Sequence, residues 1–139
     1  CHQLAMYVVC ESPLSMMADN PTHYKREPES TAFIASVPTV FHQTVALGGT
    51  LGEYVAIARR NGDEWFVGAM TSWEAREIEI DFSFLKDGKF NAEIFKDGIN
   101  ADRNANDYKR EVVEITSDTR MKVSMAPGGG WAARLVPVK

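Results

Sequence analysis

Residues 76–83 read Arg-Glu-Ile-Glu-Ile-Asp-Phe-Ser, and this short stretch indicates the fold class most clearly. Three apolar side chains alternate with three acidic ones: Ile78, Ile80 and Phe82 against Glu77, Glu79 and Asp81. A period of two is that of a β-strand with one face in a core and the other in water. Strands of this one-sided kind are typical of antiparallel sheets. We therefore expect an antiparallel sheet with one solvated face.

Turn residues divide the chain from Thr39 onward into segments of similar length. The segments predict strands near 40–47, 52–60, 64–72, 76–83, 89–96, 108–116, 120–126 and 131–138, with pairs such as Gly48-Gly49 between them. The pair Asn61-Gly62 predicts a tight hairpin, because both residues tolerate positive φ. No helical pattern separates the strands, so the sequence predicts a mainly β fold: an antiparallel two-sheet β-sandwich of about eight strands.

The first 37 residues follow a helical pattern instead. Leu4 to Glu11 predict a helix that is apolar on almost every side, so it needs cover on both flanks. Ser12-Pro13 is a helix-start signal for a second run, through Ala18, that Asp19-Asn20-Pro21 breaks. A third helix is expected from Glu29 to Val37. The predicted organisation is a segment of two or three short α-helices over 1–37, followed by the sandwich domain over 38–139.

Composition and charge exclude several classes of partner. The 139 residues carry a net charge of −4, with 24% charged and 45% hydrophobic residues. There is no basic stripe for nucleic acid and no polybasic run for anionic lipid, and the apolar run from Leu4 to Cys10 is too short to span a bilayer. Cys1 and Cys10 would lie roughly 13 Å apart along one helix, beyond disulfide reach. We expect no nucleic acid partner, no membrane and no disulfide.

The residues that could carry chemistry do not form a catalytic or metal site. The carboxylates of the β region mostly occupy solvated faces or lie beside Lys or Arg, so we expect no catalytic pair. His2, His23 and His42 have no metal-ligand spacing with Cys, Asp or Glu. The loop 100–107 alternates side-chain oxygens and has Glu111 at its twelfth position, as calcium loops do, but Ala105 stands where the turn needs Gly. We favour Asx turns there, with no metal and no cofactor in this chain.

Aromatic residues leave one alternative open. Flat rings stack on sugars in carbohydrate-binding modules, and the chain has Trp65, Trp73 and Trp131. Trp65 and Trp131 fall in apolar strands, where a large ring more often fills a core. Trp73 stands at a strand end beside polar residues, so it is the candidate carbohydrate-binding residue. A carbohydrate-binding sandwich is therefore the alternative function.

Several long segments together resemble one enzyme family. They are CHQLAMYVV at 1–9, ESPLSMMADNPTHY at 11–24, GEYVAIARR at 52–60, DEWFVG at 63–68, AEIFKDGINADRNANDY at 92–108 and APGGGWAAR at 126–134. In order and content they resemble the C-terminal region of glycoside hydrolase family 97, from the end of the catalytic barrel through the C-terminal β-sandwich. The resemblance covers nearly the whole chain.

The resemblance implies a three-part α-glucosidase or α-galactosidase that is periplasmic or secreted. Its catalytic carboxylates and calcium ligands belong to regions that precede the segment corresponding to Cys1, so no catalytic residue is assigned in this chain. We expect a noncatalytic structural and oligomerisation domain, whose partners are the enzyme's own catalytic barrel and, in a homodimer, a second copy. The sequence distinguishes neither glucosidase from galactosidase nor inverting from retaining chemistry.

Overall fold

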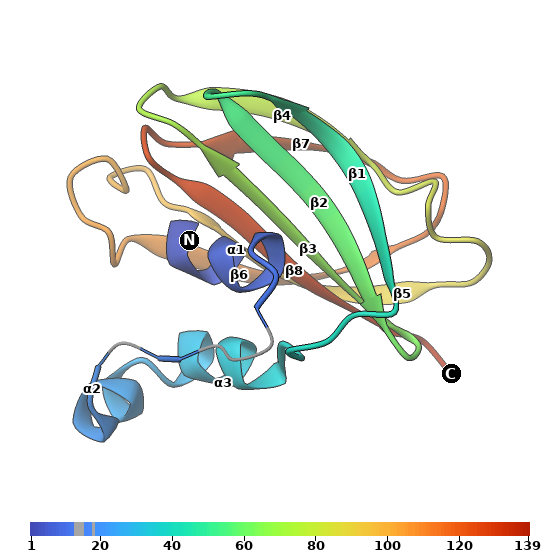
Figure 1. The fold of residues 1–139 in the computed structure, drawn as a ribbon, viewed down its shortest axis with the longest axis horizontal. Coiled ribbons are helices and arrows are strands. Elements are labelled where there is room, and N and C mark those ends of the chain that lie inside the picture. The colour runs from blue at the N-terminus through green and yellow to red at the C-terminus, as the bar shows by residue number, and fades with distance from the viewer. Residues whose placement is uncertain (13–15, 18) are drawn as a thin grey trace.

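A computed structural model describes residues 1–12, 16, 17 and 19–139. Its strands are β1 Gln43–Thr50, β2 Tyr54–Asn61, β3 Glu64–Thr71, β4 Arg76–Asp81, β5 Phe90–Asp97, β6 Tyr108–Ile115, β7 Arg120–Met125 and β8 Gly130–Pro137. A six-stranded sheet has the order β1-β2-β3-β8-β5-β6, and β4 pairs with β7 in a second sheet. All the pairs are antiparallel. The predicted mainly β sandwich is confirmed (Figure 1).

The predicted alternation of buried apolar and exposed acidic side chains in and just after β4 is confirmed. Ile80 and Phe82 are almost fully buried, while Glu77, Glu79 and Asp81 are exposed. These apolar side chains contribute to a core between the two sheets, together with Trp65 and Trp131, which are 6% and 2% exposed. The predicted core positions of both tryptophans are thus confirmed, and each fully buried large side chain contributes about 2–3 kcal/mol of transfer free energy.

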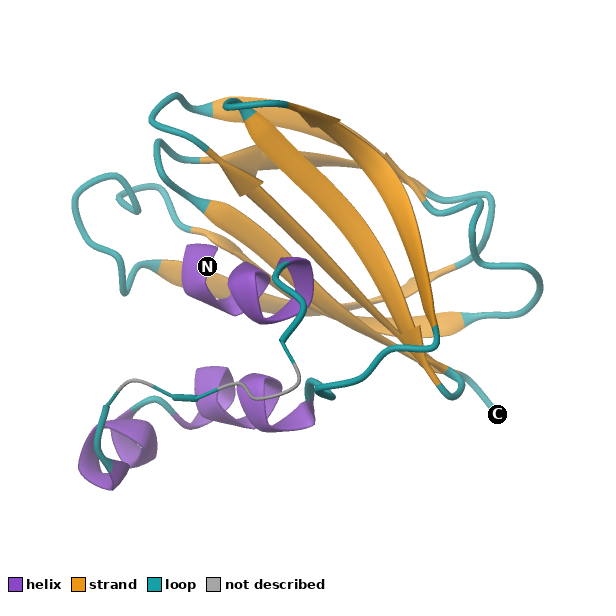
Figure 2. Cartoon of the chain, viewed as in Figure 1, coloured by secondary structure: helices purple, strands orange, loops and turns teal. Residues whose placement is uncertain are grey.

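Three short helices precede the strands: α1 His2–Val9, α2 Pro21–Arg26 and α3 Pro28–Ser36 (Figure 2). The first and third helices were expected. The second expected helix falls largely on residues 13–15 and 18, outside the described residues, and its described members Ser12, Met16 and Met17 are not helical. None of the helices described has the length and apolar character needed to cross a membrane.

The residues read as a break, Asp19-Asn20-Pro21, instead start α2. The Asn20 side chain accepts hydrogen bonds from the amides of Thr22 and His23 at 3.1 and 3.2 Å. Pro21 stands at the first helical position, where its missing N–H costs nothing. The same residues that interrupt one helical run can thus open the next, because an N-cap side chain and a proline at the first helical position both favour a helix start.

Two turn predictions need correction. The pair Gly48-Gly49 lies inside β1, where the register with β2 shifts between Ala46 and Gly48, and the turn comes later, with Gly52 at φ 79°. A side chain on Gly48 would meet the Tyr54 hydroxyl at 3.3 Å, which explains a glycine within a strand. The hairpin after β2 is confirmed, but its two loop residues are Gly62 and Asp63 instead of Asn61 and Gly62. Of the two loop residues, Gly62 takes a positive φ.

Candidate docking surface

α1 lies across the outer face of the six-stranded sheet, over β2, β3 and β8 (Figure 1). Leu4, Ala5 and Val8 are buried against that face in a second core, which includes Phe66 and Phe95. A Cβ on Gly68 would lie 3.0 Å from both the carbonyl oxygen of Ala5 and the Cβ of Val8. The absence of a side chain on Gly68 is therefore what lets the helix approach the sheet so closely.

The end of α1 is held by a buried arginine of β2. Arg59, 6% exposed, donates from Nε to the carbonyl oxygen of Val8 at 2.7 Å and from Nη2 to that of Val9 at 2.9 Å. Carbonyl groups in the last turn of a helix have no partner within the helix, and a cation there is also favoured by the helix dipole. Arg59 satisfies both conditions and fixes the C-terminus of α1 to the sheet.

The start of α1 lies against the turn between β7 and β8. His2 Nδ1 is 3.1 Å from the carbonyl oxygen of Gly129. The Asp97 carboxylate orders the same turn, because its Oδ2 accepts from the amides of Ala126 and Gly130, each at 3.0 Å. α1 is thus attached to the sandwich at both ends as well as along one face.

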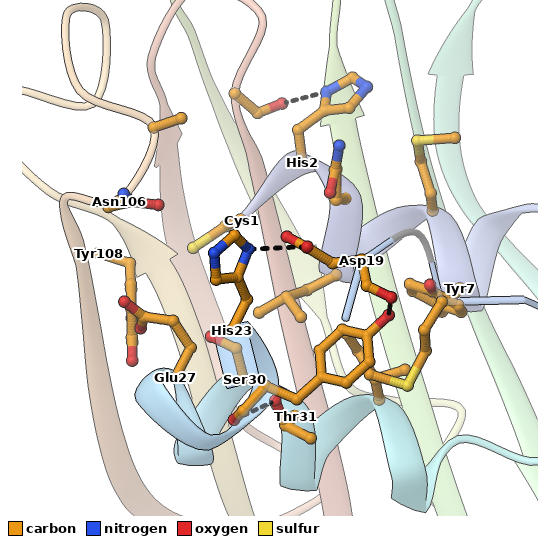
Figure 3. A pocket seen from close by; sticks show the side chains of 18 of the residues that line it. Cys1, His2, Tyr7, Asp19, His23, Glu27, Ser30, Thr31, Asn106 and Tyr108 are labelled. Carbon is orange, nitrogen blue, oxygen red and sulfur yellow. Dashed lines mark hydrogen bonds and ion pairs between the residues drawn. The ribbon is translucent and has the colours of Figure 1, made fainter. Parts of the chain in front are cut away.

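The opposite face of α1 is open to a groove of about 820 Å³. It is lined by residues of α1, α2, α3 and the loop 98–107, together with Met16 and Met17. Figure 3 shows Tyr7, His23 and Asn106 among these side chains. Apolar side chains contribute to its wall, and Met6 and Met16 are 41% and 78% exposed. Tyr7 crosses part of it and donates its hydroxyl proton to the carbonyl oxygen of Met16 at 3.1 Å. Among the residues that the structure describes, the cover predicted for both flanks of α1 is seen on the sheet side.

α2 and α3 form the far side of this groove and differ in how they are supported. α3 places Phe33, 2% exposed, against Phe95 with ring centroids 5.1 Å apart. α2 buries none of its residues and lies apart from the sandwich in Figure 1. A helix of six residues has little stability of its own in water. We therefore expect α2 to be stabilised by packing on a surface beyond this sandwich.

Local polar contacts hold α2 in place beside the groove. The His23 ring nitrogen Nδ1 is 2.7 Å from Asp19 Oδ1, and the Tyr24 hydroxyl donates to the carbonyl oxygen of Asp19 at 2.8 Å. The hydrogen bonds from His23 and the amide of Asn20 lower the pKa of the Asp19 carboxyl below its ordinary value. Figure 3 shows Asp19 and His23 at the rim of the groove with Tyr7 near them.

Several carboxylates of the sandwich are engaged with basic side chains. Five of them form ion pairs: Glu53 with Arg76, Glu64 with Arg134, Glu93 with Arg110, Glu111 with Lys96 and Glu114 with Lys89. Retaining or inverting glycosidases need two carboxyl groups facing one sugar across a defined gap. That the sandwich contains no such catalytic pair stays a prediction.

The histidines and the loop 100–107 are engaged in local structure. His42 Nδ1 accepts from the amide of Gly62 at 3.2 Å, while His2 and His23 have the partners given above. In the loop, Asn104 Oδ1 accepts from the amide of Asn106 at 3.1 Å, an Asx turn, and Asp107 Oδ2 accepts from the amide of Asn100 at 2.7 Å. Over residues 1–12, 16, 17 and 19–139, no three His, Cys, Asp or Glu side chains gather as metal ligands would.

Trp73, the candidate carbohydrate-binding residue, projects from the turn between β3 and β4 and is 91% exposed. The turn itself is ordered, because Thr71 Oγ1 donates to the carbonyl oxygen of Glu74 at 3.0 Å and the Ser72 amide donates to that of Glu53 at 2.8 Å. Trp73 is thus a free ring on a supported turn. Sugar binding by this ring stays a prediction.

Two residues that position the helices were not foreseen. Arg59 reads as one of two arginines ending a strand, and Asp97 as a turn residue. An arginine on a strand face that is otherwise apolar is a usable signal, since a guanidinium is rarely buried without acceptors. The acceptors themselves belong to residues some fifty positions earlier in the chain, so no local pattern could name them.

Comparison with known proteins agrees with this architecture. A retaining alpha-galactosidase of Bacteroides thetaiotaomicron is 54% identical over 135 residues, which are 97% of this chain and 20% of that protein. A glycoside hydrolase family 97 enzyme from Pseudoalteromonas sp. strain K8, solved with acarbose, is 38% identical with a TM-score of 0.95, over 99% of this chain and 22% of that one. A beta-arabinopyranosidase shares the fold at 24% identity and a TM-score of 0.76, over 96% of this chain and 20% of its own.

The chain therefore spans about a fifth of the length of these relatives. The family model described as "Glycosyl-hydrolase 97 C-terminal, oligomerisation" matches residues 40–136, from just before β1 to the last residue but one of β8. That match extends over more than half of the sequence. The chain belongs to the glycosyl-hydrolase 97 C-terminal family.

Proposed function

We propose that this chain is the noncatalytic C-terminal part of an α-glucosidase or α-galactosidase, where it braces the catalytic barrel and associates with a second copy. The observation that carries the proposal is the one-sided burial of α1. One face and both ends of the helix are fixed to the sandwich, while Met6 and Tyr7 face an open groove. The remaining polypeptide of such an enzyme would fill that groove.

The bracing role follows from how rigidly the helices are held. Burial of apolar surface favours association, and a surface that is already ordered avoids part of the entropy cost of binding. A partner that packs on α1 and α3 is thereby fixed relative to the whole sandwich. The catalytic carboxylates, and the calcium that the family resemblance implies, would belong to that partner region.

A binding experiment between this chain and the upstream region tests the docking role. The chain, produced alone, should not hydrolyse nitrophenyl α-glucoside or α-galactoside, and it should bind the separately produced upstream region of its own native polypeptide. Met6→Lys and Met16→Lys should weaken that binding at least tenfold, because each places a charge on the groove wall. Lys122→Met, on exposed β7, is the matched control and should change nothing. Full binding by both groove variants would contradict the docking role.

Export from the cytoplasm is part of the same proposal and rests on the family resemblance. A signal peptide at the start of the native reading frame is the expected observation. A frame that encodes a barrel directly before Cys1 would support the proposed architecture independently of any signal.

Carbohydrate binding remains a second candidate because one specific observation favours it: Trp73 exposes 91% of its surface on an ordered turn. Stacking on a sugar ring would bury that surface. Titration with maltooligosaccharides should then quench tryptophan fluorescence saturably in the parent chain and not in Trp73→Ala. Equal quenching in the two proteins, or none in either, would reject a sugar site at this ring.

A further inference from the structure

β1 forms one edge of the six-stranded sheet, with β2 on one side only. Asn61 pairs with Glu64 beside the hairpin turn, so the backbone N–H and C=O groups of Asn61 point to β3. Because these groups alternate in direction along a strand, those of Arg60 and Ala58 point to β1. These pair with Gln43 and Val45. The same alternation directs the N–H and C=O groups of Thr44 and Ala46 away from the sheet. Before the register shift, β1 therefore presents a short ladder of backbone groups without a strand partner.

This edge lacks the charged side chains that often protect an exposed strand edge. Charged side chains on an edge strand discourage pairing with another chain. Between Glu29 and Glu53 the sequence contains no Asp, Glu, Lys or Arg, and β1 is the one strand among the eight described that carries no charge. The opposite edge, β6, carries four charged residues, Lys109, Arg110, Glu111 and Glu114. The two edge strands of the six-stranded sheet thus differ in the number of charged side chains that they carry.

Exposed apolar side chains flank the same strand. Val40, just before β1, is 61% exposed, and Leu51, just after it, is fully exposed. Ala46 is exposed in the middle. Depletion of charge together with exposed apolar groups is the composition of the buried centre of a protein interface. The uncharged edge and these flanks form one continuous strip of chain, which we call the β1 strip, residues 40–51.

We infer that a second copy of this chain pairs with the β1 strip, strand to strand and antiparallel, about a two-fold axis near Val45. This deepens the proposed oligomerisation role by naming its surface. A two-fold contact needs a surface complementary to itself, and an antiparallel strand edge is one. In this register Thr44 of each copy faces Ala46 of the other, so all the outward backbone groups of both residues find partners.

The register also extends the core. Val45 and Leu47 are partly buried and pack against the core between the sheets. With the axis at Val45, the two Val45 side chains become neighbours on the core side of the joined sheet, where cross-strand β-branched pairs are stabilising. The second sheet competes poorly for this role, because the free edges of β4 and β7 carry Glu77, Glu79, Arg120 and Lys122.

Sedimentation equilibrium of the parent chain and three variants tests the inference. Ala46→Lys adds a charge beside the axis, and Ala46→Pro removes the outward N–H without adding charge. Each should raise the dimer dissociation constant at least tenfold. Val112→Lys places the same charge on the exposed part of β6, where Val112 is 57% exposed, and should leave it within twofold. Amide hydrogen exchange of the parent chain should show that Thr44 and Ala46 become protected as protein concentration rises.

The outcomes separate this inference from the broader proposal. A dimer that survives both Ala46 substitutions, or amides of Thr44 and Ala46 that exchange freely in the dimer, would place self-association elsewhere and overturn the inference while leaving the oligomerisation role intact. A parent chain that stays monomeric at all concentrations would refute self-association itself. If the Ala46 variants lose their unfolding transition, the exchange pattern of the parent chain decides.

Discussion

Arg59 Nε lies 2.7 Å from the carbonyl oxygen of Val8, so a side chain near the end of β2 closes the last turn of α1. This contact explains why α1 behaves as part of the sandwich, although it precedes the first strand by more than thirty residues. It also couples helix and sheet electrostatically, since the guanidinium is buried at the negative end of the helix dipole. The surface that α1 presents to the groove is therefore a rigid one.

Replacing Arg59 should loosen this attachment. Arg59→Met keeps the aliphatic stem and leaves the carbonyl groups of Val8 and Val9 without their donor, at a cost of about 2–4 kcal/mol in unfolding free energy. Urea denaturation measures the loss. Arg120→Met, at an exposed ion pair with Asp81, should change stability by less than about 1 kcal/mol. Equal effects of the two substitutions would contradict the anchoring role of Arg59.

Adding one methyl group to Gly68 should push α1 from the sheet. The new Cβ would lie 3.0 Å from Ala5 and Val8 atoms, and overpacking of this kind costs about 1–3 kcal/mol. Gly62→Ala is the comparison: its Cβ meets nothing within 4 Å, but its φ of 60° is strained for alanine. Both variants should be less stable, and faster hydrogen exchange of the α1 amides should follow only from Gly68→Ala. Unchanged α1 exchange would argue against the steric explanation.

The stability of α2 at acid pH should depend on the ionisation of the Asp19 carboxyl. Because His23 lowers the pKa of this carboxyl from 3.8, the ionised form stabilises the folded state above the unfolded pKa, and that stabilisation is lost as pH falls through the lower folded value. Carbon NMR titration should find the Asp19 pKa below 3.8, and His23→Ala should return it toward that value. Identical titrations in the two proteins would show that His23 is not the cause.

Trp73 and Trp131 should differ sharply when truncated. Trp131 is 2% exposed in the core between the sheets, so Trp131→Ala should cost about 3–5 kcal/mol. Trp73→Ala should change unfolding free energy by no more than about 0.5 kcal/mol, since a fully solvated ring loses little. In the parent chain, acrylamide should readily quench the part of the tryptophan emission that comes from exposed Trp73. That readily quenched part should be absent from Trp73→Ala. A large loss of stability in Trp73→Ala would reveal packing that its exposure does not show.

Calcium should leave the loop 100–107 unaffected. Asn104 Oδ1 and Asp107 Oδ2 accept from backbone amides of the loop, and Glu111, the twelfth position, is 2.8 Å from Lys96 Nζ. Millimolar calcium should therefore shift Tm no more than the same concentration of magnesium does. Asn104→Ala, which breaks the Asx turn at Asn106, should lower Tm whether or not calcium is present. A calcium-specific rise in Tm would restore the metal hypothesis for this loop.

The sequence by itself determined the sandwich. Alternation in residues 76–83, regularly spaced turn residues and the Asn61-Gly62 pair are local signals, because strand periodicity and positive φ depend on a few adjacent residues. The same local logic identified the core tryptophans and the exposed position of Trp73. The family resemblance was confirmed by comparison, whereas the boundary between 1–37 and 38–139 and the sugar-binding role of Trp73 stay predictions.

Tertiary structure alone decided how the helices attach and which edge is left open. The closeness of Gly68 to α1 and the hydrogen bonds of Arg59 depend on partners far along the chain. The absence of charge between Glu29 and Glu53 is visible in the sequence, but it acquires meaning only when strand order places β1 at an edge. Periodicity fixes which face of a strand is buried, and only the folded arrangement fixes which strand has no neighbour.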